Sequence, residues 1–308
     1  MKHFIITIDT EGDNLWSYHD GDKVETENTL AIPRFQDFCE TFEFKPVYLT
    51  NYEMICDDRF VEYIKPKVEA GLCEVGIHVH AWNNPPLFQL KRKYSGNPYL
   101  IEYPTEVMRD KFAETYYLIK DRIGKVPVTH RAGRWVMNEA YFRLLKEFDV
   151  KVDCSFTPNV SWANSPGQTM EGGNDYTQVN REAHIVDGVL EVPMTIRKIR
   201  RKKEGSLKSR VKTLIKGEIV WLRPALASLN CMKNLCSRVD KEKNIDYLEF
   251  MLHSSELMVG GSPYFKTNHD IDNLYLIMGQ LFDFVSKLGY KGITLADYEK
   301  EHGKNGSK

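Results

Sequence analysis

The stretch CEVGIHVHAW, residues 73–82, is a short alternating apolar run that ends in two histidines, His78 and His80. Alternation with a period of two predicts a β-strand in which residues two apart point to the same face. The two imidazoles therefore share one face where the strand ends. Trp82 follows them, and a loop begins at the pair of prolines just beyond. Both the fold and the function depend on what the other strands carry at their ends.

Short apolar runs recur along the chain and predict further strands. They cover residues 4–9, 46–50, 127–131, 150–155, 190–194, 247–253 and 291–295. Segments with apolar residues at spacings of three and four predict helices over 105–123, 138–148 and 271–288. Strands that alternate with helices favour parallel pairing, so the class is α/β, with either an open sheet or a (β/α) barrel.

Length and composition favour one large domain. The chain has 308 residues, of which 42% are hydrophobic, so residues 1–308 are expected to share a single core. The formal net charge of -1 gives no general attraction to nucleic acid, and no nucleic-acid partner is expected. Six cysteines without a CxxC pair, and a start without a signal-peptide core, predict a cytoplasmic protein.

A basic segment interrupts the alternation of strands and helices between residues 195 and 245. Residues 197–223 contain eleven Lys or Arg and two Glu. Apolar residues at helical spacing within it predict an amphipathic helix, and these are Val211, Leu214, Ile215, Ile219 and Leu222. Such a helix could hold the protein at the inner face of a membrane, near a lipid-linked substrate, or it could pack on the domain by its apolar stripe.

Polar residues follow several of the predicted strands, at the end where the active sites of barrels lie. Carboxylate and imidazole side chains together are suitable ligands for a divalent ion such as zinc. Such an ion would lower the pKa of a bound water and polarise a carbonyl group. The candidate residues are Asp9 and Glu11 after the first strand, His78 and His80, Arg131 and Arg134, Asp153, and His253.

Five stretches, TIDTEGDN, EVGIHVHAW, HRAGRW, VDCSFTP and FMLHSSEL, resemble in this order the five motifs of polysaccharide deacetylases. These are the NodB-homology proteins, similar to carbohydrate esterase family 4. The likeness is greatest to their lipopolysaccharide and surface-glycan biosynthesis branch, and it runs from about residue 5 to 295. It implies a distorted (β/α)7 barrel, in which the basic segment 195–245 would be a helical insertion. It also implies a metal-dependent hydrolase that removes an N-acetyl group from an amino sugar of a glycan or lipid-linked glycan precursor.

The resemblance assigns a role to each matching position. Asp9 matches the catalytic base, Arg131 the arginine that holds this base, and His253 the histidine that protonates the leaving amine. Asp153 matches the acid that orients that histidine. Glu11 and His78 match metal ligands, with zinc as the expected ion. Trp82, Arg134 and Trp135 are expected to contact the sugar.

Two departures from the family pattern bear on the metal. The first motif of the family has two adjacent aspartates, whereas Thr10 separates Asp9 from Glu11 here. The second motif has its histidines four apart, but Trp82 occupies that position. His80 is expected to replace the missing ligand. Two alternatives stay open: an inactive barrel that binds glycan or acts as a scaffold, and a metal-free C–N hydrolase of the same superfamily.

Overall fold

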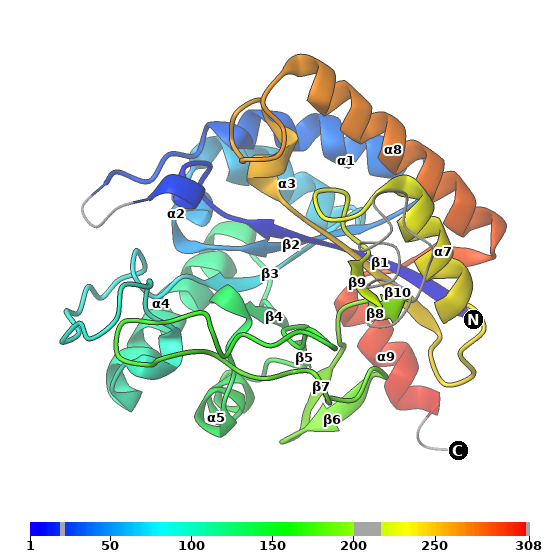
Figure 1. Cartoon of the computed structure of the whole chain (residues 1–308). Coiled ribbons are helices and arrows are strands. Elements are labelled where there is room, and N and C mark those ends of the chain that lie inside the picture. The colour runs from blue at the N-terminus through cyan, green and yellow to red at the C-terminus, as the bar shows by residue number, and fades with distance from the viewer. Residues whose placement is uncertain (19–21, 200–216, 306–308) are drawn as a thin grey trace, which may run out of the picture.

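The structure is a computed structural model that describes residues 1–18, 22–199 and 217–305 (Figure 1). Its centre is a curled sheet whose main strands run parallel. In spatial order these are β10 (Tyr247–His253), β1 (Lys2–Thr10), β2 (Pro46–Thr50), β3 (Glu74–Val79), β4 (Thr129–Ala132), β5 (Val152–Asp153) and β7 (Val189–Glu191). β6 (His184–Val186) pairs antiparallel with β7, and β11 (Tyr290–Gly292) pairs with β1. The predicted α/β class is confirmed, and the expected (β/α) barrel is present as a curled, parallel half-barrel sheet.

Helices pack around this sheet (Figure 1). They are α1 (Ile32–Glu40), α2 (Tyr52–Cys56), α3 (Asp58–Glu69), α4 (Thr105–Ile123), α5 (Glu139–Glu147), α7 (Leu229–Val239), α8 (Asn268–Lys287) and α9 (Leu295–Asn305). α1 and α8 lie side by side, since Arg34 pairs with Asp272 and the ring of Phe38 packs against Tyr275. Within the described ranges, no helix combines the length and the apolar character needed to cross a membrane.

Strand register brings the polar strand ends together. Residues 3–10 of β1 are all buried, as expected for a central parallel strand with both faces covered. In the pairing of β1 with β10, Asp9 lies opposite His253. In the pairing of β3 with β4, His78 lies opposite Arg131. Parallel strands end at the same edge of a sheet, so groups far apart in the sequence share one rim.

The chain around Thr195 and Leu222 bridges the gap between β7 and β10. The backbone N–H of Glu249 donates to Thr195 Oγ1 at 2.8 Å, and that of Met251 donates to the Leu222 carbonyl at 3.2 Å. A small apolar cluster fills the interior beside this bridge, made of Trp135, Tyr176, Met194, Ile196, Trp221 and Met251. The half-barrel is therefore closed by packing and a few hydrogen bonds on this side.

The basic segment differs from its prediction where the structure describes it. β8 (Ile196–Ile199) and β9 (Glu218–Trp221) form an antiparallel pair, so a helix through Ile219 and Leu222 is wrong. Leu222 is fully buried and donates its N–H to the Thr195 carbonyl, which extends the strand arrangement. Val211, Leu214 and Ile215 lie outside the described residues, as does all of 200–216. Within 195–245, α7 is helical.

Candidate active site

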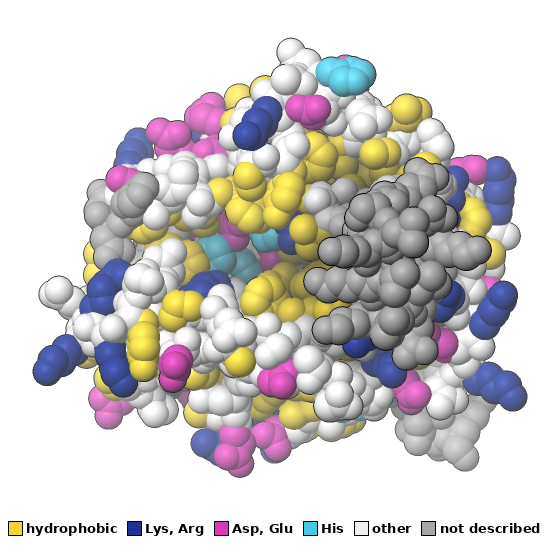
Figure 2. Space-filling model, viewed as in Figure 1, with side chains coloured by type: hydrophobic (Ala, Val, Ile, Leu, Met, Phe, Trp, Pro, Cys, Tyr) yellow, Lys and Arg dark blue, Asp and Glu magenta, His cyan; other side chains and the backbone are white. Residues whose placement is uncertain are grey.

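A cavity of about 480 Å³ opens at the carboxyl ends of the strands. Figure 2 shows it as a hollow with histidine and acidic side chains at its base and hydrophobic side chains around it. Eight of the residues predicted for the site line it: Asp9, Glu11, His78, His80, Trp82, Arg134, Trp135 and His253. Arg131 is fully buried and contacts Asp9. Asp153 is buried elsewhere, against His130.

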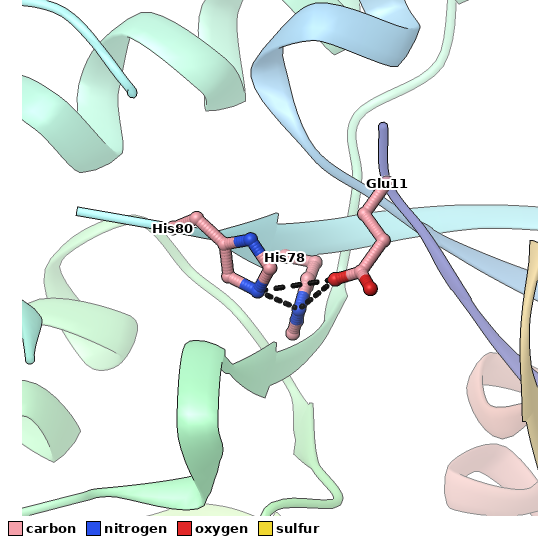
Figure 3. A group of neighbouring side chains, drawn as sticks. All are labelled: Glu11, His78 and His80. Atoms are coloured by element: carbon pink, nitrogen blue, oxygen red, sulfur yellow. Dashed lines mark hydrogen bonds and ion pairs between the residues drawn. The ribbon is translucent and has the colours of Figure 1, made fainter. Parts of the chain in front are cut away.

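Glu11, His78 and His80 converge on one point (Figure 3). Nε2 of His78 lies 3.0 Å from Nε2 of His80, and Oε2 of Glu11 lies 3.1 Å from the latter and 3.7 Å from the former. All three side chains are buried. Among the described residues, this is the group of ligand-bearing side chains close enough to hold a metal ion. Histidines two apart on a strand can therefore serve a single ion.

The tautomer of His78 suits a metal ligand. Its Nδ1 lies 2.8 Å from the carbonyl oxygen of Arg131, which can only accept, so Nδ1 carries the hydrogen. Nε2 then presents a lone pair to Glu11 and His80. This arrangement, in which a backbone carbonyl orients a ligand histidine, is common around bound metals. Nδ1 of His80 has no partner among the described residues.

The charges of Glu11 and His80 also suit a cation, whereas Asp9 and Glu11 outweigh burial and raise the pKa of His78. Burial raises the pKa of the Glu11 carboxyl to about 7, although His78 opposes this shift. Burial, and then the neighbouring His78, hold the pKa of His80 well below its usual value. A cation would stabilise the ionised carboxylate and needs both imidazoles neutral at the atoms that bind it. The residues present therefore fit a divalent ion with positions left for water.

Two residues after β2 hold the backbone of the ligand-bearing loops. Oδ1 of Asn51 accepts from the N–H of His80 at 3.2 Å. Oε1 of Glu53 accepts from the N–H of Gly12, the residue after Glu11, at 2.7 Å. These two hydrogen bonds hold both loops in place.

Asp9 is held ionised by a buried arginine. Nη1 of Arg131 donates to Oδ1 of Asp9 at 2.6 Å, and Nη2 contacts Thr7 and the carboxylate of Glu249. Burial alone would raise the pKa of Asp9, but Arg131, His78 and His253 outweigh it and hold that pKa below its usual range. Glu249 was not predicted, although it shares a strand face with His253, four residues on.

His253 has a different partner from the one expected. Its Nδ1 lies 2.9 Å from Nη2 of Arg223, which itself pairs with Glu256 at 2.5 Å. Arginine can only donate, so Nδ1 accepts and Nε2 carries the hydrogen. Nε2 lies 3.7 Å from Oδ2 of Asp9. Burial, and then Arg223, lower the pKa of His253 well below its usual value.

The expected contact between Asp153 and His253 is therefore wrong. Oδ1 of Asp153 lies 2.7 Å from Nδ1 of His130, and it also accepts from Ser155 Oγ at 2.8 Å. β4 and β5 pair with His130 opposite Asp153, so strand register makes these two residues neighbours. A match of motif order carries no information about which side chains touch.

The predicted sugar contacts are partly used by the protein itself. Trp82 stacks on the His80 ring with centroids 4.3 Å apart. The Arg134 guanidinium donates to the backbone carbonyls of Asn97 and Pro166 and lies over the Tyr99 ring. Trp135 is 9% exposed and packs on Arg131.

Three further tryptophans, Trp16, Trp162 and Trp221, complete the cavity wall. Together with Trp82 and Trp135 they are all five tryptophans of the chain. They come from loops and strands widely separated in sequence, so no local pattern could have grouped them. Aromatic walls are typical of sites that bind ring-shaped, partly apolar ligands.

The strand order and the cavity define an α/β half-barrel with acidic and histidine side chains at the carboxyl ends of its strands. No family model matches the chain, and no curated protein matches it. Solved structures do share its fold. The 4-α-glucanotransferase from Thermococcus litoralis superposes with a TM-score of 0.55 at 12% identity, over 97% of this chain and 40% of that one.

Two further solved structures match over nearly the whole chain. The Xyl-CE4 domain of a multidomain xylanase from the hindgut metagenome of Trinervitermes trinervoides has a TM-score of 0.48 at 12% identity, over 98% of this chain and 91% of that one. The family 4 acetyl xylan esterase from Clostridium thermocellum has a TM-score of 0.48 at 13% identity, over 98% and 92%. At these identities the likeness concerns the fold, and the reaction must be argued from the site.

Proposed function

We propose that this protein is a metal-dependent hydrolase that removes an N-acetyl group from an amino sugar of a glycan or lipid-linked glycan precursor. The observation that carries the proposal is the meeting, in one cavity, of the Glu11–His78–His80 triad with an arginine-held Asp9 and with His253. A divalent ion bound by the triad would polarise the amide carbonyl and acidify a water.

The chain's own residues would then handle the protons. Asp9, kept ionised by Arg131, takes a proton from the attacking water as general base. The same carboxyl would then pass that proton to the leaving nitrogen. His253 would only donate a hydrogen bond to the substrate from Nε2, because Arg223 occupies its Nδ1. The resemblance implies a larger role, in which His253 gives up a proton to the leaving amine. Burial of the cavity floor strengthens each of these interactions.

Apolar side chains at the mouth support a substrate with a lipid carrier. Trp16, Leu226 and Tyr264 line the cavity and are 40%, 46% and 41% exposed. An exposed apolar rim beside a hydrolytic centre suits a ligand with a hydrophobic part. The eleven Lys and Arg of the basic segment 197–223 would attract an anionic membrane surface. The cytoplasmic location and membrane contact belong to the same proposal.

Acetate release tests the activity. Purified protein loaded with zinc should release acetate from N-acetylated amino sugars, and Asp9→Asn should lower the rate by roughly 10²–10⁴-fold. Asp37→Asn, at an exposed aspartate, serves as the matched control and should keep full activity. An ion bound in the triad without acetate release from any acetylated sugar would favour an inactive glycan-binding barrel. Full activity without metal would favour the metal-free hydrolase.

A further inference from the structure

Arg131 lies between two carboxylates, of which Asp9 lines the catalytic cavity and Glu249 does not. Nη1 of Arg131 donates to Asp9 at 2.6 Å, and Nη2 donates to Glu249. Thr7 joins the two, because its Oγ1 accepts from Nη2 at 2.7 Å and donates to Oε1 of Glu249 at 3.0 Å. Thr7, Arg131 and Glu249 are fully buried. The proposed general base therefore shares one guanidinium with a second, buried acid.

The register of β1 and β10 places Glu249 beside this guanidinium. Asp9 lies opposite His253 in the pairing of the two strands. Residues two apart on a strand share a face, so Thr7 lies on the face of Asp9, and Glu249 lies on the face of His253. The backbone N–H of Glu249 is also bound, since it donates to Thr195 Oγ1 at 2.8 Å. Backbone and side chain together keep the carboxylate in this position.

The surroundings of Glu249 let it ionise near neutral pH. Burial raises the pKa of Glu249 to about 7, although Arg131 and Thr7 oppose the rise. The titratable side chains that interact with Glu249 come from β1, β4, β5, β7, β10 and the residue after β5, and they are Asp9, Arg131, Asp153, Cys154, Glu191 and Tyr247. In this set, Arg131 carries the positive charge.

The charge of Glu249 decides how strongly Arg131 acts on Asp9. When Glu249 is ionised, it offsets part of the positive charge of the guanidinium, so Asp9 holds a proton more readily. When Glu249 is neutral, Arg131 acts on Asp9 with its full charge, and Asp9 is a weaker base. A general base is most effective when its proton affinity is not far below that of the surroundings. An ionised Glu249 therefore favours proton transfer to Asp9.

We infer that Glu249 is a positioning residue for the general base: its negative charge, acting through Arg131, keeps Asp9 basic enough to take a proton from the attacking water. This inference rests on the proposed function, because it takes Asp9 as the base. The two hydrogen bonds that Nη2 of Arg131 donates, to Glu249 and to Thr7, also keep Nη1 directed at Asp9.

The ratio of wild-type kcat to that of Glu249→Gln, measured across pH, tests this inference. Glutamine keeps an acceptor for Arg131 and Thr7 but carries no charge. With zinc and an N-acetylated amino sugar both saturating, the ratio should be near one at about pH 5.5 and rise to about tenfold at about pH 8. The midpoint should lie near pH 7, where Glu249 ionises. Groups that titrate equally in both proteins cancel in the ratio.

Thr7→Val supplies a second variant with a different signature. It removes the hydrogen bond that Glu249 accepts from Thr7, which favours the ionised carboxylate. The pKa of Glu249 should rise further, so the increase in kcat should move up by about one pH unit. The ratio of wild type to Thr7→Val should then be largest between about pH 7 and 8. This expectation holds even if Glu249→Gln does not fold.

Glu191→Gln is the matched control, another buried acid of the sheet changed to its amide. Burial, and then Asp153, hold the pKa of Glu191 well above its usual value, so Glu191 is already neutral. Its Oε1 accepts from the N–H of Phe156 at 2.9 Å, a bond that glutamine retains. The ratio of wild-type kcat to that of Glu191→Gln should not vary with pH.

Nitrogen NMR of the arginine side chains gives a readout that does not need acetate release. The Arg131 signals, assigned with Arg131→Lys, should titrate near pH 7 in wild type and not in Glu249→Gln. A kcat ratio for Glu249→Gln that is constant across pH, or Arg131 signals that do not titrate, would overturn the inference, while acetate release would still support the deacetylase. Conversely, Arg131 signals that follow Glu249, without acetate release by zinc-loaded wild type, would keep the coupling and reject the deacetylase.

Discussion

His78 and Glu11 show how single atoms set the chemistry of the triad. The Arg131 carbonyl fixes the hydrogen of His78 on Nδ1, so Nε2 is free to bind an ion whatever the conformation of His80. Glu11 supplies the negative charge, but burial makes that charge costly without a cation. The affinity of the site for a metal ion is therefore expected to depend on pH through Glu11.

Zinc affinity should fall in mild acid. The pKa of Glu11 is raised to about 7 by burial, so below that pH the carboxyl is protonated before the ion binds. Ion and proton then compete, and Glu11 alone should lower the apparent affinity by about tenfold per pH unit below pH 7. Above pH 7 this residue adds no further dependence. Competition with a chelator of known affinity measures the profile, and a flat one from about pH 5.5 to 7.5 would contradict the raised pKa.

Substitution of Asp153 should affect stability, whereas substitution of Arg223 should affect catalysis. Asp153→Ala removes the partner of buried His130, so it should cost about 1–3 kcal/mol in the free energy of unfolding and leave kcat within a few-fold. Arg223→Met frees Nδ1 of His253 and should change kcat much more than KM. Denaturant unfolding and steady-state kinetics on both variants check this. A large loss of kcat in Asp153→Ala at unchanged stability would restore the orienting role expected from the motif.

At the scale of elements, the ends of β3 and β4 depend on a close approach at Gly133. A Cβ added there would lie 2.3 Å from the carbonyl oxygen of Val79 and 2.7 Å from Cδ2 of His80. Gly133→Ala must therefore displace the end of β3 and the His80 ring. We expect weaker zinc binding and a loss of about 1–3 kcal/mol in the free energy of unfolding.

Gly279 in α8 provides the control for this substitution. A Cβ there would meet Phe38 at 3.7 Å, an ordinary contact distance. Gly279→Ala should leave zinc binding unchanged and could raise stability by up to about 1 kcal/mol, because alanine favours helix. Calorimetric titration with zinc compares the two variants. Wild-type affinity in Gly133→Ala would show that His80 is not needed.

Elements with a clear period could be predicted from the sequence. The run 247–253 and the segment 105–123 match β10 and α4 in their bounds. α3 escaped prediction, since Pro66 lies inside it and proline usually ends a helix. The sequence predicts a helix through β9 because Ile219 and Leu222 are three apart, but short apolar runs can show this spacing in either state.

The candidate site could also be predicted where it depends on the period of a strand. Strand parity places Asp9 with Glu11, and His78 with His80, on common faces, and the structure brings all four to one cavity. The contacts of His253 could not be predicted. Its partner Arg223 follows β9, and only the tertiary arrangement decides which charged group reaches Nδ1.

At the scale of the whole molecule, ion binding couples to folding because the three ligands come from two distant segments joined by the sheet. Zinc at about 100 times its Kd should raise the free energy of unfolding by about 2.7 kcal/mol. The rise should vanish in Glu11→Gln. It should persist in His184→Ala, since this histidine lies outside the cavity and bonds to the Glu182 carbonyl. Equal stabilisation of wild type and Glu11→Gln would place the ion elsewhere.

The central claim is that Glu11, His78 and His80 hold one ion at the base of the cavity. A crystal structure grown with zinc, with anomalous data, tests it most directly. We expect a single strong anomalous peak in this cavity, at about 2.0–2.2 Å from Nε2 of both histidines and from a Glu11 carboxylate oxygen. A cavity without such a peak, or a peak that His80 turns away from, would contradict it.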